Sequence, residues 1–378
     1  MPPKNYLSIE GPDQNFYGYG NMTVSLRSHL PPNIELAADA PVVVYAMLPN
    51  MVSGWYRGQK RVLFTMWETT KLPSHYYEEL SQFDQIIVPC EHNRGVFLEY
   101  HDNVDVVPLG INPSLWQICS TPKNKKFTFI TGGSNWWRKG IDIVLDAFIK
   151  LDNPDTHLII KLSPDAYASM PQVELPSNVT LYKDWMSQQE EYNLYASADC
   201  FISASRGEGF GLIPLQVMAM GLPTIISDMS GHQEFSHLAN HALPCEEVDI
   251  QKGHFQQVGR WYEIDTDDLV IAMSDHMKNK GKHRAKAKAN AVSAQEWTWD
   301  KSAAKLVEVV GVGKRLPEMV WEPALEAKVF IVCNRSVTAD VNDRQYSFVK
   351  GEEYLVPVNV KQTIREAGYL EKTWLPEK

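Results

Sequence analysis

Two adjacent cations stand next to paired glycines at a predicted junction between a strand and a helix. Arg138 and Lys139 come shortly after Gly132 and Gly133, which follow the apolar segment 127–131. Glycine lets a ligand approach backbone amides closely, and neighbouring cations can stabilise a leaving group that gains negative charge, such as a diphosphate. A solvated basic pair is the alternative, but the dipole at a helix start disfavours positive charge. The pattern therefore predicts that both cations bind phosphate.

A second glycine-rich stretch, residues 205–234, places a carboxylate at the start of an apolar helix. Glu208 and the neighbouring Phe210 are surrounded by three glycines: Gly207, Gly209 and Gly211. The predicted helix 212–220 follows, and after it the predicted buried strand 224–227. A helix N-terminus beside glycines favours an anion, while Glu208 can accept hydrogen bonds from hydroxyl groups. Alternatively, the carboxylate only complements the helix dipole, which is worth about 0.3–1 kcal/mol.

The first part of the chain alternates predicted strands and helices, which argues for a parallel sheet covered on both faces. The predicted strands are 5–9, 41–47, 62–66 and 85–89, and the segment 104–112 closes this half. The predicted helices are one that follows residues 18–21 and ends at Leu30, and one at 91–100. Gly18, Tyr19 and Gly20 are predicted to form a loop before the first helix, where an α/β domain contacts its ligand. A plain turn explains these three residues equally well.

The second part of the chain repeats the alternation after a polar linker, residues 114–126. The predicted strands are 127–131, 157–162, 178–182, 199–203 and 224–227. The predicted helices are 141–151, 188–198, 212–220, 265–277 and a last one that ends at 310. The basic run 278–288 is predicted to be a solvated helix face. Asp265 and Asp267 have the spacing of a metal motif, but their place before a helix predicts helix capping instead.

The composition is that of a soluble globular protein with several domains. The chain has 378 residues, of which 44% are hydrophobic and 22% charged, and its formal net charge is −10. This charge argues against a general binder of nucleic acid or anionic membranes. The five cysteines are widely spaced without a CxxC pair, so we expect no disulfide framework, no zinc site and a reducing cytoplasm. We see no apolar signal core and no apolar run of the about 20 residues that a membrane span needs.

The glycine stretch resembles the nucleotide-binding core of retaining glycosyltransferases with the GT-B fold, glycosyltransferase family 4 (group 1). The family pattern Glu-Gly-Phe-Gly matches 208–211, and Met-Ala-x-Gly-x-Pro matches 218–223. A glycine loop that ends in Glu follows, here Gly231 and Glu234. The resemblance extends to the first half through the segments 66–69, 88–94 and 108–110.

Four residues depart from the family pattern. Trp67 and Cys90 stand where family members often carry His and Ser, and the first half is short for the family, so its acceptor pocket could be reduced or open. Ser134 stands where the family usually has Arg, and Gln216 where it has a second Glu. Gln offers one acceptor oxygen and a donor amide, so we expect ribose binding that is weakened but retained. A buried Gln satisfied by the backbone is an equally good explanation.

The resemblance implies a role for each residue of a site that faces a cleft between two domains. Arg138 and Lys139 would bind the diphosphate in place of a metal ion, and Glu208 would bind the donor sugar's hydroxyls. Glu68 would be the base or orienting carboxylate on the acceptor side. The other donor contacts would be Gly133, Ser134, Trp185, Gly209, Phe210, Gly211, Gln216, Gly231 and Glu234. The acceptor-side loop would be Gly18, Tyr19 and Gly20. Trp185 would stack on the base unless it is buried in the core, and Glu234 could equally be a helix-start charge.

We therefore predict an α/β protein with the GT-B fold. Two Rossmann-like domains, 1–115 and 123–310, are expected to face a cleft, followed by a small C-terminal α+β or β module at 311–378. In this module, strand 328–333 is expected to pair with 346–349 and 354–356, ahead of a helix at 358–367. The module vaguely resembles small β-modules of phage proteins. It would either mediate interaction or targeting, or brace the transferase.

The predicted activity is transfer of a hexose-type sugar from a UDP- or GDP-sugar, with retention at the anomeric carbon, to a glycan, lipid or protein. We expect no metal, no cofactor besides the nucleotide-sugar substrate, and no nucleic-acid partner. A nucleotide-sugar epimerase or a phosphorylase of the same fold is an alternative, and the lack of an evident cofactor lysine motif disfavours the phosphorylase. A scaffold without turnover is a further alternative, favoured by Gln216 and the short first half but opposed by the intact Glu208, Arg138 and Lys139.

Overall fold

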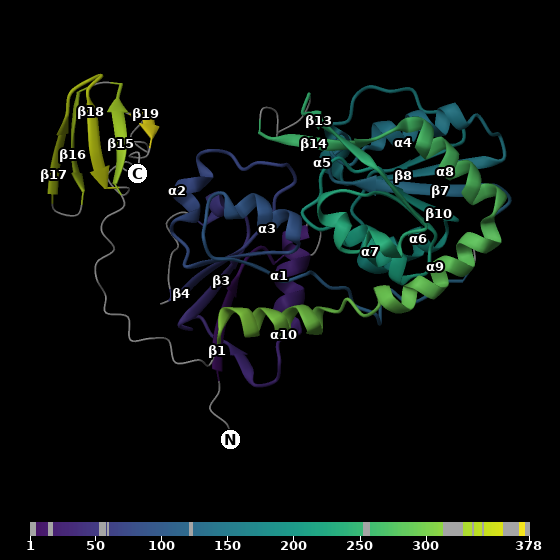
Figure 1. The fold of residues 1–378 in the computed structure, drawn as a ribbon, viewed down its shortest axis with the longest axis horizontal. Helices are drawn as coiled ribbons and strands as arrows, with labels where there is room; N and C mark the ends of the chain where they lie inside the picture. Colours follow the sequence, from purple (N-terminus) through teal and green to yellow (C-terminus); the bar gives the residue numbers. More distant parts are fainter. Residues whose placement is uncertain are drawn as a thin grey trace. The chain divides into compact units, whose positions relative to one another are not determined.

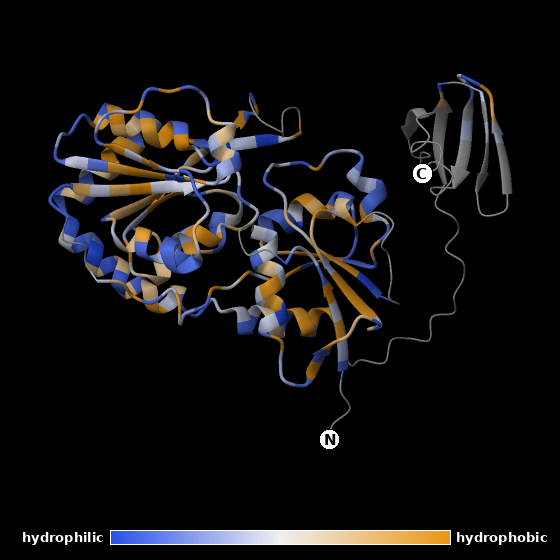
Figure 2. Ribbon diagram, turned by 180° about the vertical axis from the view of Figure 1, so that it is seen from behind, coloured by the Kyte–Doolittle hydropathy of each residue, from blue (hydrophilic) through white to orange (hydrophobic). Residues whose placement is uncertain are grey.

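The computed structural model describes residues 5–13, 18–52, 58, 60–120, 124–251, 258–312, 328–334, 336–341, 344–357 and 370–374. The chain divides into two compact units, Met1–Gly313 and Lys314–Lys378, and each is described by itself. The larger unit contains two six-stranded parallel sheets. Helices cover each of the two sheets (Figure 1). Hydrophobic residues concentrate in the strands of both sheets (Figure 2). None of the helices in the described part of the chain is long and apolar enough to cross a membrane.

The first sheet has the strand order β2-β1-β3-β4-β5-β6, and all neighbours are parallel. Its strands are β1 (Asn5–Glu10), β2 (Ile34–Leu36), β3 (Val42–Ala46), β4 (Lys60–Phe64), β5 (Gln85–Val88) and β6 (Val104–Val106). Its helices are α1 (Gly18–Ser28), α2 (Tyr76–Leu80) and α3 (Glu91–Leu98). Successive side chains of a strand face opposite sides, so Val44 packs with Met22 of α1 while Val43 packs with Leu80 of α2. The prediction missed β2 and α2, which are too short for a periodic pattern.

The predicted loop of Gly18, Tyr19 and Gly20 is wrong, because these residues form the first turn of α1. Glycine costs about 1 kcal/mol in a helix relative to alanine. Here the burial of Met22 and Leu26 against the sheet outweighs that cost, since tertiary packing supplies most of a helix's stability.

The second sheet has the strand order β12-β11-β10-β7-β8-β9, again all parallel. Its strands are β7 (Phe127–Gly133), β8 (Thr156–Leu162), β9 (Val179–Tyr182), β10 (Cys200–Ser203), β11 (Thr224–Ser227) and β12 (His241–Leu243). Its helices are α4 (Ile141–Leu151), α5 (Pro164–Ala168), α6 (Gln188–Ala196), α7 (Leu212–Ala219), α8 (Thr266–Lys278) and α9 (Lys280–Ala294). One face of the sheet packs on α4 and α8, and the other packs on α6 and α7 (Figure 1).

Several details of the second half differ from the sequence-based expectation. Gly132 and Gly133 were expected in a loop but extend strand β7, where they pair with Lys161 and Leu162 of β8. An antiparallel hairpin of β13 (Cys245–Asp249) and β14 (Arg260–Ile264) was not predicted. The capping prediction is confirmed, because the side chain of Asp265 accepts hydrogen bonds from the first backbone N–H groups of α8.

The end of the larger unit returns to the first sheet. Ile111 pairs with the backbone of Trp297 and Trp299, and α10 (Trp299–Val310) then packs against α1. The Nζ of Lys60 donates to the carbonyl oxygen of Val310 at 3.0 Å. Trp299 is buried at the start of this helix and anchors it.

The smaller unit is antiparallel in its described residues. Its strands are β15 (Lys328–Cys333), β16 (Val337–Val341), β17 (Arg344–Phe348), β18 (Glu353–Pro357) and β19 (Leu370–Trp374). β15 pairs with β18, as predicted, and also with β19. The predicted pairing of 346–349 with β15 is wrong, because β17 forms a hairpin with the neighbouring β16. The predicted helix 358–367 lies outside the described residues.

Candidate active site

The predicted donor residues lie at the carboxyl ends of the strands of the second sheet. The segments 134–140, 204–211 and 228–235 leave β7, β10 and β11 at this edge. The strand order reverses between β10 and β7, and ligands of open α/β sheets bind at such a reversal. The fold therefore brings the Gly133 and Glu208 segments together, although they are far apart in the sequence.

Lys139 and Glu208 form a close ion pair at this edge. The Nζ of Lys139 lies 2.5 Å from Oε1 of Glu208, and both side chains are largely buried. Gly133 makes room for the lysine, since a Cβ at this glycine would lie 2.6 Å from Cγ of Lys139. The absence of a side chain at Gly133 thus positions the stem of the lysine beside the strand end.

Arg138 joins the same cluster through both its side chain and its backbone. Its Nη1 donates to the carbonyl oxygen of Gly207 at 2.7 Å and lies 3.4 Å from Oε2 of Glu208. Its Nη2 lies 4.0 Å from Oε1 of Glu68, which comes from the loop after β4 in the first sheet. The carbonyl oxygen of Arg138 accepts from the backbone N–H of Arg206 at 2.6 Å, which joins the two loops.

The protonation of this cluster follows from burial and from charge. Burial disfavours ionised Glu208, but the charges of Lys139 and Arg138 outweigh it and lower the pKa of Glu208 from 4.5 to about 2. Burial lowers the pKa of Lys139, an effect that Glu208 opposes. Burial also raises the pKa of Glu68, against the attraction of Arg138. Glu208 is therefore firmly anionic at neutral pH.

The backbone around Glu208 is fixed by the loop after β11. The N–H of Glu208 donates to Oγ of Ser230 at 3.1 Å, and the N–H of Gly231 donates to the carbonyl oxygen of Glu208 at 3.1 Å. A Cβ at Gly231 would lie 2.5 Å from Cα of Phe210, so only glycine fits there. Gly211 has φ +104 and caps α7, a conformation that favours glycine.

Gln216 lies inside α7, and only 5% of its surface is exposed. Its side-chain amide takes part in none of the hydrogen bonds found among the described residues, and its backbone carbonyl oxygen accepts from the N–H of Met220. A ribose contact at this position stays a prediction.

Ser134, Trp185 and Glu234, which were also predicted to contact the donor, differ in their exposure and in their contacts. Ser134 is exposed in the segment after β7. Trp185 is 36% exposed in the segment between β9 and α6, so it is not a core residue. Oε1 of Glu234 accepts from the backbone N–H of Glu91 at 2.8 Å, at the N-terminus of α3 in the first half. Glu234 therefore complements a helix start, although the helix belongs to the other sheet.

The first half meets the cluster through the segment after β4. The hydroxyl of Tyr19 lies 3.0 Å from Oγ1 of Thr65 and accepts from the backbone N–H of Met66 at 3.0 Å, which places α1 beside this segment. Gly209 approaches the side chain of Met66 so closely that a Cβ would lie 2.6 Å from it. The Sγ of Cys90 donates to the carbonyl oxygen of Gly209 at 3.2 Å, and burial raises the pKa of this thiol to about 12.

His232 and Arg206 also hold the site, although neither was predicted from the sequence. His232 is fully buried, and its Nδ1 lies 2.9 Å from the carbonyl oxygen of Ser227, while its Nε2 has no hydrogen-bond partner in the described structure. Arg206 forms a two-pronged contact with Asp142, with both distances 2.8 Å, and a contact of 2.5 Å with Glu263. Both residues could have been found from their position in the sequence, because each is a basic residue next to a glycine of a predicted site loop. Arg206 directly precedes Gly207, and His232 directly follows Gly231.

Substitution of Gly133 by alanine tests whether the glycine positions Lys139. The new Cβ would displace the lysine stem, and loss of one charge-assisted hydrogen bond should weaken binding of UDP or GDP, the ligands that the sequence leads us to expect, by about 10–100-fold. Calorimetry measures the affinity. Gly95→Ala is the control, because nothing lies within 4 Å of a Cβ at Gly95. Equal affinities of the two variants would contradict the positioning role.

Substitution of Gln216 by glutamate should strengthen nucleotide binding. A carboxylate accepts from both ribose hydroxyls, whereas the amide offers one acceptor, so we expect about a 10-fold gain in affinity. Gln189→Glu on the exposed face of α6 is the matched control. An unchanged affinity of the Gln216 variant for UDP and GDP in calorimetry would rule out a ribose contact at this position.

Two Rossmann-like domains, each with a parallel sheet, give this unit the GT-B fold. Residues 125–256 match the family model described as Glycosyl transferases group 1, which supports a group 1 glycosyltransferase. Among solved structures, Anabaena HepE in complex with UDP and glucose superposes with a TM-score of 0.60 at 12% identity, which covers 82% of this chain and 100% of that chain. A likeness at this identity shows the fold alone.

Viral proteins are among the similar curated proteins. The protein named "Putative glycosyltransferase 45" of Sulfolobus islandicus filamentous virus is 23% identical over 251 residues. These residues cover 61% of this chain and 68% of that protein. The uncharacterized glycosyltransferase 335 of Sulfolobus islandicus rod-shaped virus 1 is 27% identical over 178 residues, which cover 44% and 52%. The chain spans about half to two thirds of the length of these relatives.

Proposed function

We propose that the chain is a glycosyltransferase that moves a hexose from a UDP- or GDP-sugar to a glycan, lipid or protein, with retention at the anomeric carbon. The observation that carries the proposal is the convergence of Lys139, Arg138 and Glu208 at the carboxyl ends of β7 and β10. The two cations would bind the diphosphate of a nucleotide sugar, and the carboxylate would accept hydrogen bonds from its sugar hydroxyls. The group 1 family match over 125–256 and the UDP and glucose bound by HepE support the same class of ligand.

Donor binding would exchange the partners within the cluster. Only 4% of the surface of Glu208 is exposed, and both of its carboxylate oxygens contact cations. The diphosphate would replace Glu208 as the partner of Lys139 and Arg138. Glu208, still anionic, would then accept hydrogen bonds from the sugar's hydroxyls. The cations would stabilise the negative charge that grows on the diphosphate as it leaves.

The chemical step we propose needs no protein nucleophile. The bond between the anomeric carbon and the diphosphate oxygen breaks, and the acceptor oxygen forms its bond on the same face of the sugar. The acceptor's proton passes to the departing phosphate oxygen. Glu68, 4.0 Å from Arg138, would orient the acceptor hydroxyl, since its raised pKa reflects burial next to this site.

Turnover should not depend on a metal ion. The two cations supply the positive charge that a metal would otherwise bring to the diphosphate. We expect product formation in EDTA to equal that in added Mg²⁺, measured well below the unfolding temperature. A loss of turnover in EDTA that Mg²⁺ restores would contradict this role of Arg138 and Lys139.

A thermal-shift panel of nucleotide sugars tests the proposed function. A donor at 100 times its dissociation constant should stabilise the folded chain by about 2.7 kcal/mol. An Arg138→Ala, Lys139→Ala double variant should lose this shift. If the double variant keeps the full shift, the diphosphate binds elsewhere; if no nucleotide sugar shifts the wild type, the chain is not a transferase of this kind.

A scaffold that binds the donor without turnover is the second candidate. Gln216 in place of the family's Glu and the engaged state of Glu208 favour it. Release of nucleoside diphosphate in the presence of the donor that binds best distinguishes the two, because a scaffold gives the thermal shift without release. All five cysteines are free thiols, and we propose a reducing compartment such as the cytoplasm for either function.

A further inference from the structure

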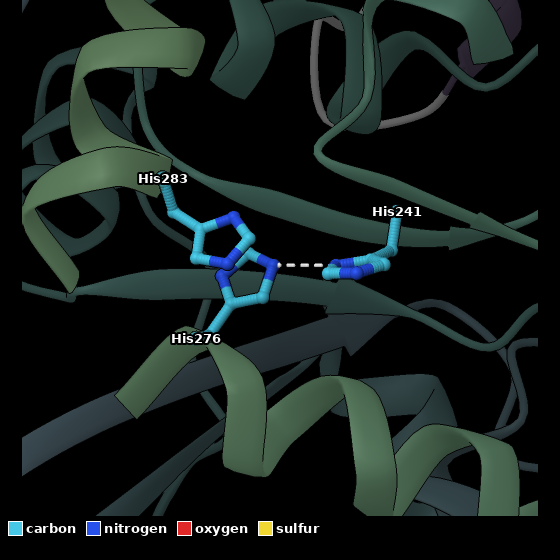
Figure 3. Close-up of side chains that lie close together, drawn as sticks. All are labelled: His241, His276 and His283. Atoms are coloured by element: carbon cyan, nitrogen blue, oxygen red, sulfur yellow. Dashed lines mark hydrogen bonds between the residues drawn. The ribbon is translucent and has the colours of Figure 1, made fainter. Parts of the chain in front are cut away.

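Three histidines from three different elements meet at the other edge of the second sheet. His241 begins β12, His276 lies in the last turns of α8, and His283 lies in the first turns of α9. One potential ligand atom of each residue lies within 4.8 Å of those of the others. Figure 3 shows the three imidazoles gathered between the strand and the two helices, with His276 bonded to His241.

Hydrogen bonds within the cluster use only part of its capacity. Nδ1 of His241 lies 3.0 Å from Nε2 of His276, while Nδ1 of His276 is buried without a hydrogen-bond partner in the described structure. His276 and His283 are 1% and 5% exposed, so water reaches these two rings poorly. Nε2 of His276, which faces His241, is the nitrogen placed to share an ion with that ring.

One carboxylate accompanies the imidazoles. Oδ2 of Asp275 lies 2.7 Å from Nε2 of His283 and 3.7 Å from Nε2 of His241. Its other oxygen accepts from the side-chain amide of Asn279 at 2.6 Å, which fixes the orientation of the carboxylate. Carboxylates that hold the imidazoles of a metal site are the usual second layer of such sites.

The basic side chains of α9 are directed to other partners. Nζ of Lys280 lies 2.7 Å from Oδ1 of Asp199. Arg284 donates to the carbonyl oxygen of Ser120 at 2.8 Å, and Lys286 donates to that of Asn240 at 3.2 Å. Lys282 and Lys286 nevertheless remain near enough to act electrostatically on His241, so a bound cation has to overcome their repulsion.

We propose that His241, His276 and His283 bind one divalent transition-metal ion, with Zn²⁺ as the best fit, and that Asp275 is its nearest carboxylate. Imidazole nitrogen suits zinc, whereas Mg²⁺ and Ca²⁺ prefer oxygen. Tetrahedral zinc with nitrogen at 2.0–2.1 Å requires ligand nitrogens about 3.3 Å apart. The separation of 3.0 Å between His241 and His276 is close to that value.

Metal binding requires one imidazole to turn. The rings of His276 and His283 stack at 3.9 Å with an interplanar angle of 10°, and two parallel rings cannot aim their in-plane lone pairs at one ion. The torsion about the Cβ–Cγ bond of histidine is broad, so a ring can turn without leaving its χ1 rotamer.

The proposed ion would be structural, because it lies opposite the candidate active site. His241 is the first residue of its strand, whereas Gly133 and Glu208 lie at or beyond strand carboxyl ends. A strand of four residues alone separates the two edges by about 13 Å. The ion would join β12 to the junction of α8 and α9, independently of donor binding.

Zinc titration of the full chain tests the proposal. After removal of metals with a chelator, equilibrium dialysis should show one Zn²⁺ per chain, and saturating Zn²⁺ should raise the unfolding temperature by about 5 °C while Mg²⁺ does not. His241→Ala should abolish stoichiometric binding. Its side chain is 32% exposed, so the variant should fold. Asp275→Asn should weaken binding by about 10–100-fold.

His157→Ala is the matched control. His157 lies near the start of β8, at the same edge of the sheet, and it is partly exposed. It forms a hydrogen bond with Oγ1 of Thr180 and not with another histidine. This variant should bind zinc like the wild type. Absence of stoichiometric zinc on the wild type, or equal binding by the His241 and His157 variants, would overturn the proposal. The thermal shift with a nucleotide sugar should be the same in the His241 variant and the wild type, so failure of either proposal leaves the other standing.

Discussion

Replacement of Lys139 by methionine should lower the release of nucleoside diphosphate from the donor by about 10²–10³-fold. Methionine keeps the length of the stem beside Gly133 but removes the charge that lies 2.5 Å from Glu208. If the diphosphate takes the place of Glu208 beside this cation, the loss falls on the step in which negative charge develops. The turnover number should therefore fall more than the donor affinity.

Steady-state kinetics with the donor that gives the largest thermal shift provides the measurement. Lys150→Met is the control: Lys150 lies on α4, is 56% exposed and pairs with Asp267 away from the cluster. The control should keep wild-type turnover. If the Lys139 variant kept full turnover, as the Lys150 control should, Lys139 would have no role in the mechanism.

Glu208→Gln should lower turnover by a similar factor and should also remove a pH-dependent part of the stability. The folded pKa of about 2 lies below the ordinary value of 4.5, because the attraction of Lys139 and Arg138 outweighs burial. The carboxylate therefore stabilises the fold fully above pH 4.5, and this contribution is lost as the pH falls toward 2. The difference corresponds to about 3 kcal/mol.

Denaturant unfolding of wild type and variant at several pH values measures this contribution. The wild type should be more stable than Glu208→Gln at pH 7, and the difference should shrink steadily below pH 4.5. Glu308→Gln, at an exposed pair with Lys305 on α10, should show almost no difference at any pH. A difference between wild type and Glu208→Gln that persists unchanged at pH 3 would mean that the carboxylate's charge does not stabilise the fold.

Long elements with a clear apolar pattern were predictable from the sequence, and short ones were not. The helix 141–151 was predicted with the bounds that α4 has, because its apolar residues recur with helical spacing over three turns. β2 and β12 have three residues each, which is too few for periodicity to act as a signal. The strands of the hairpin, CEEVD in β13 and RWYEI in β14, mix charged and apolar residues without regular alternation, so their pattern predicts no strand.

The composition of the donor cluster was predictable, but its pairing was not. Charged residues next to Gly133 and around Glu208 indicate a site because both segments follow buried strands of one sheet. The ion pair between Lys139 and Glu208 depends on the lateral order of β7 and β10, and the approach of Glu68 to Arg138 depends on contact between the two domains. Neither the order of the strands in the sheet nor the contact between the domains can be predicted from the spacing of residues along the chain. The histidine cluster shows the same limit, since its members come from three elements.

The return of α10 to the first sheet has a consequence for synthesis of the chain on the ribosome. The apolar side of α1 packs with Leu306 and Val310, which are made about 280 residues after it. During translation the first sheet therefore emerges with one flank uncovered and stays so until the second sheet is complete. A fragment cut at the linker should expose that flank and aggregate, whereas supplying 299–310 as a separate peptide should restore its solubility.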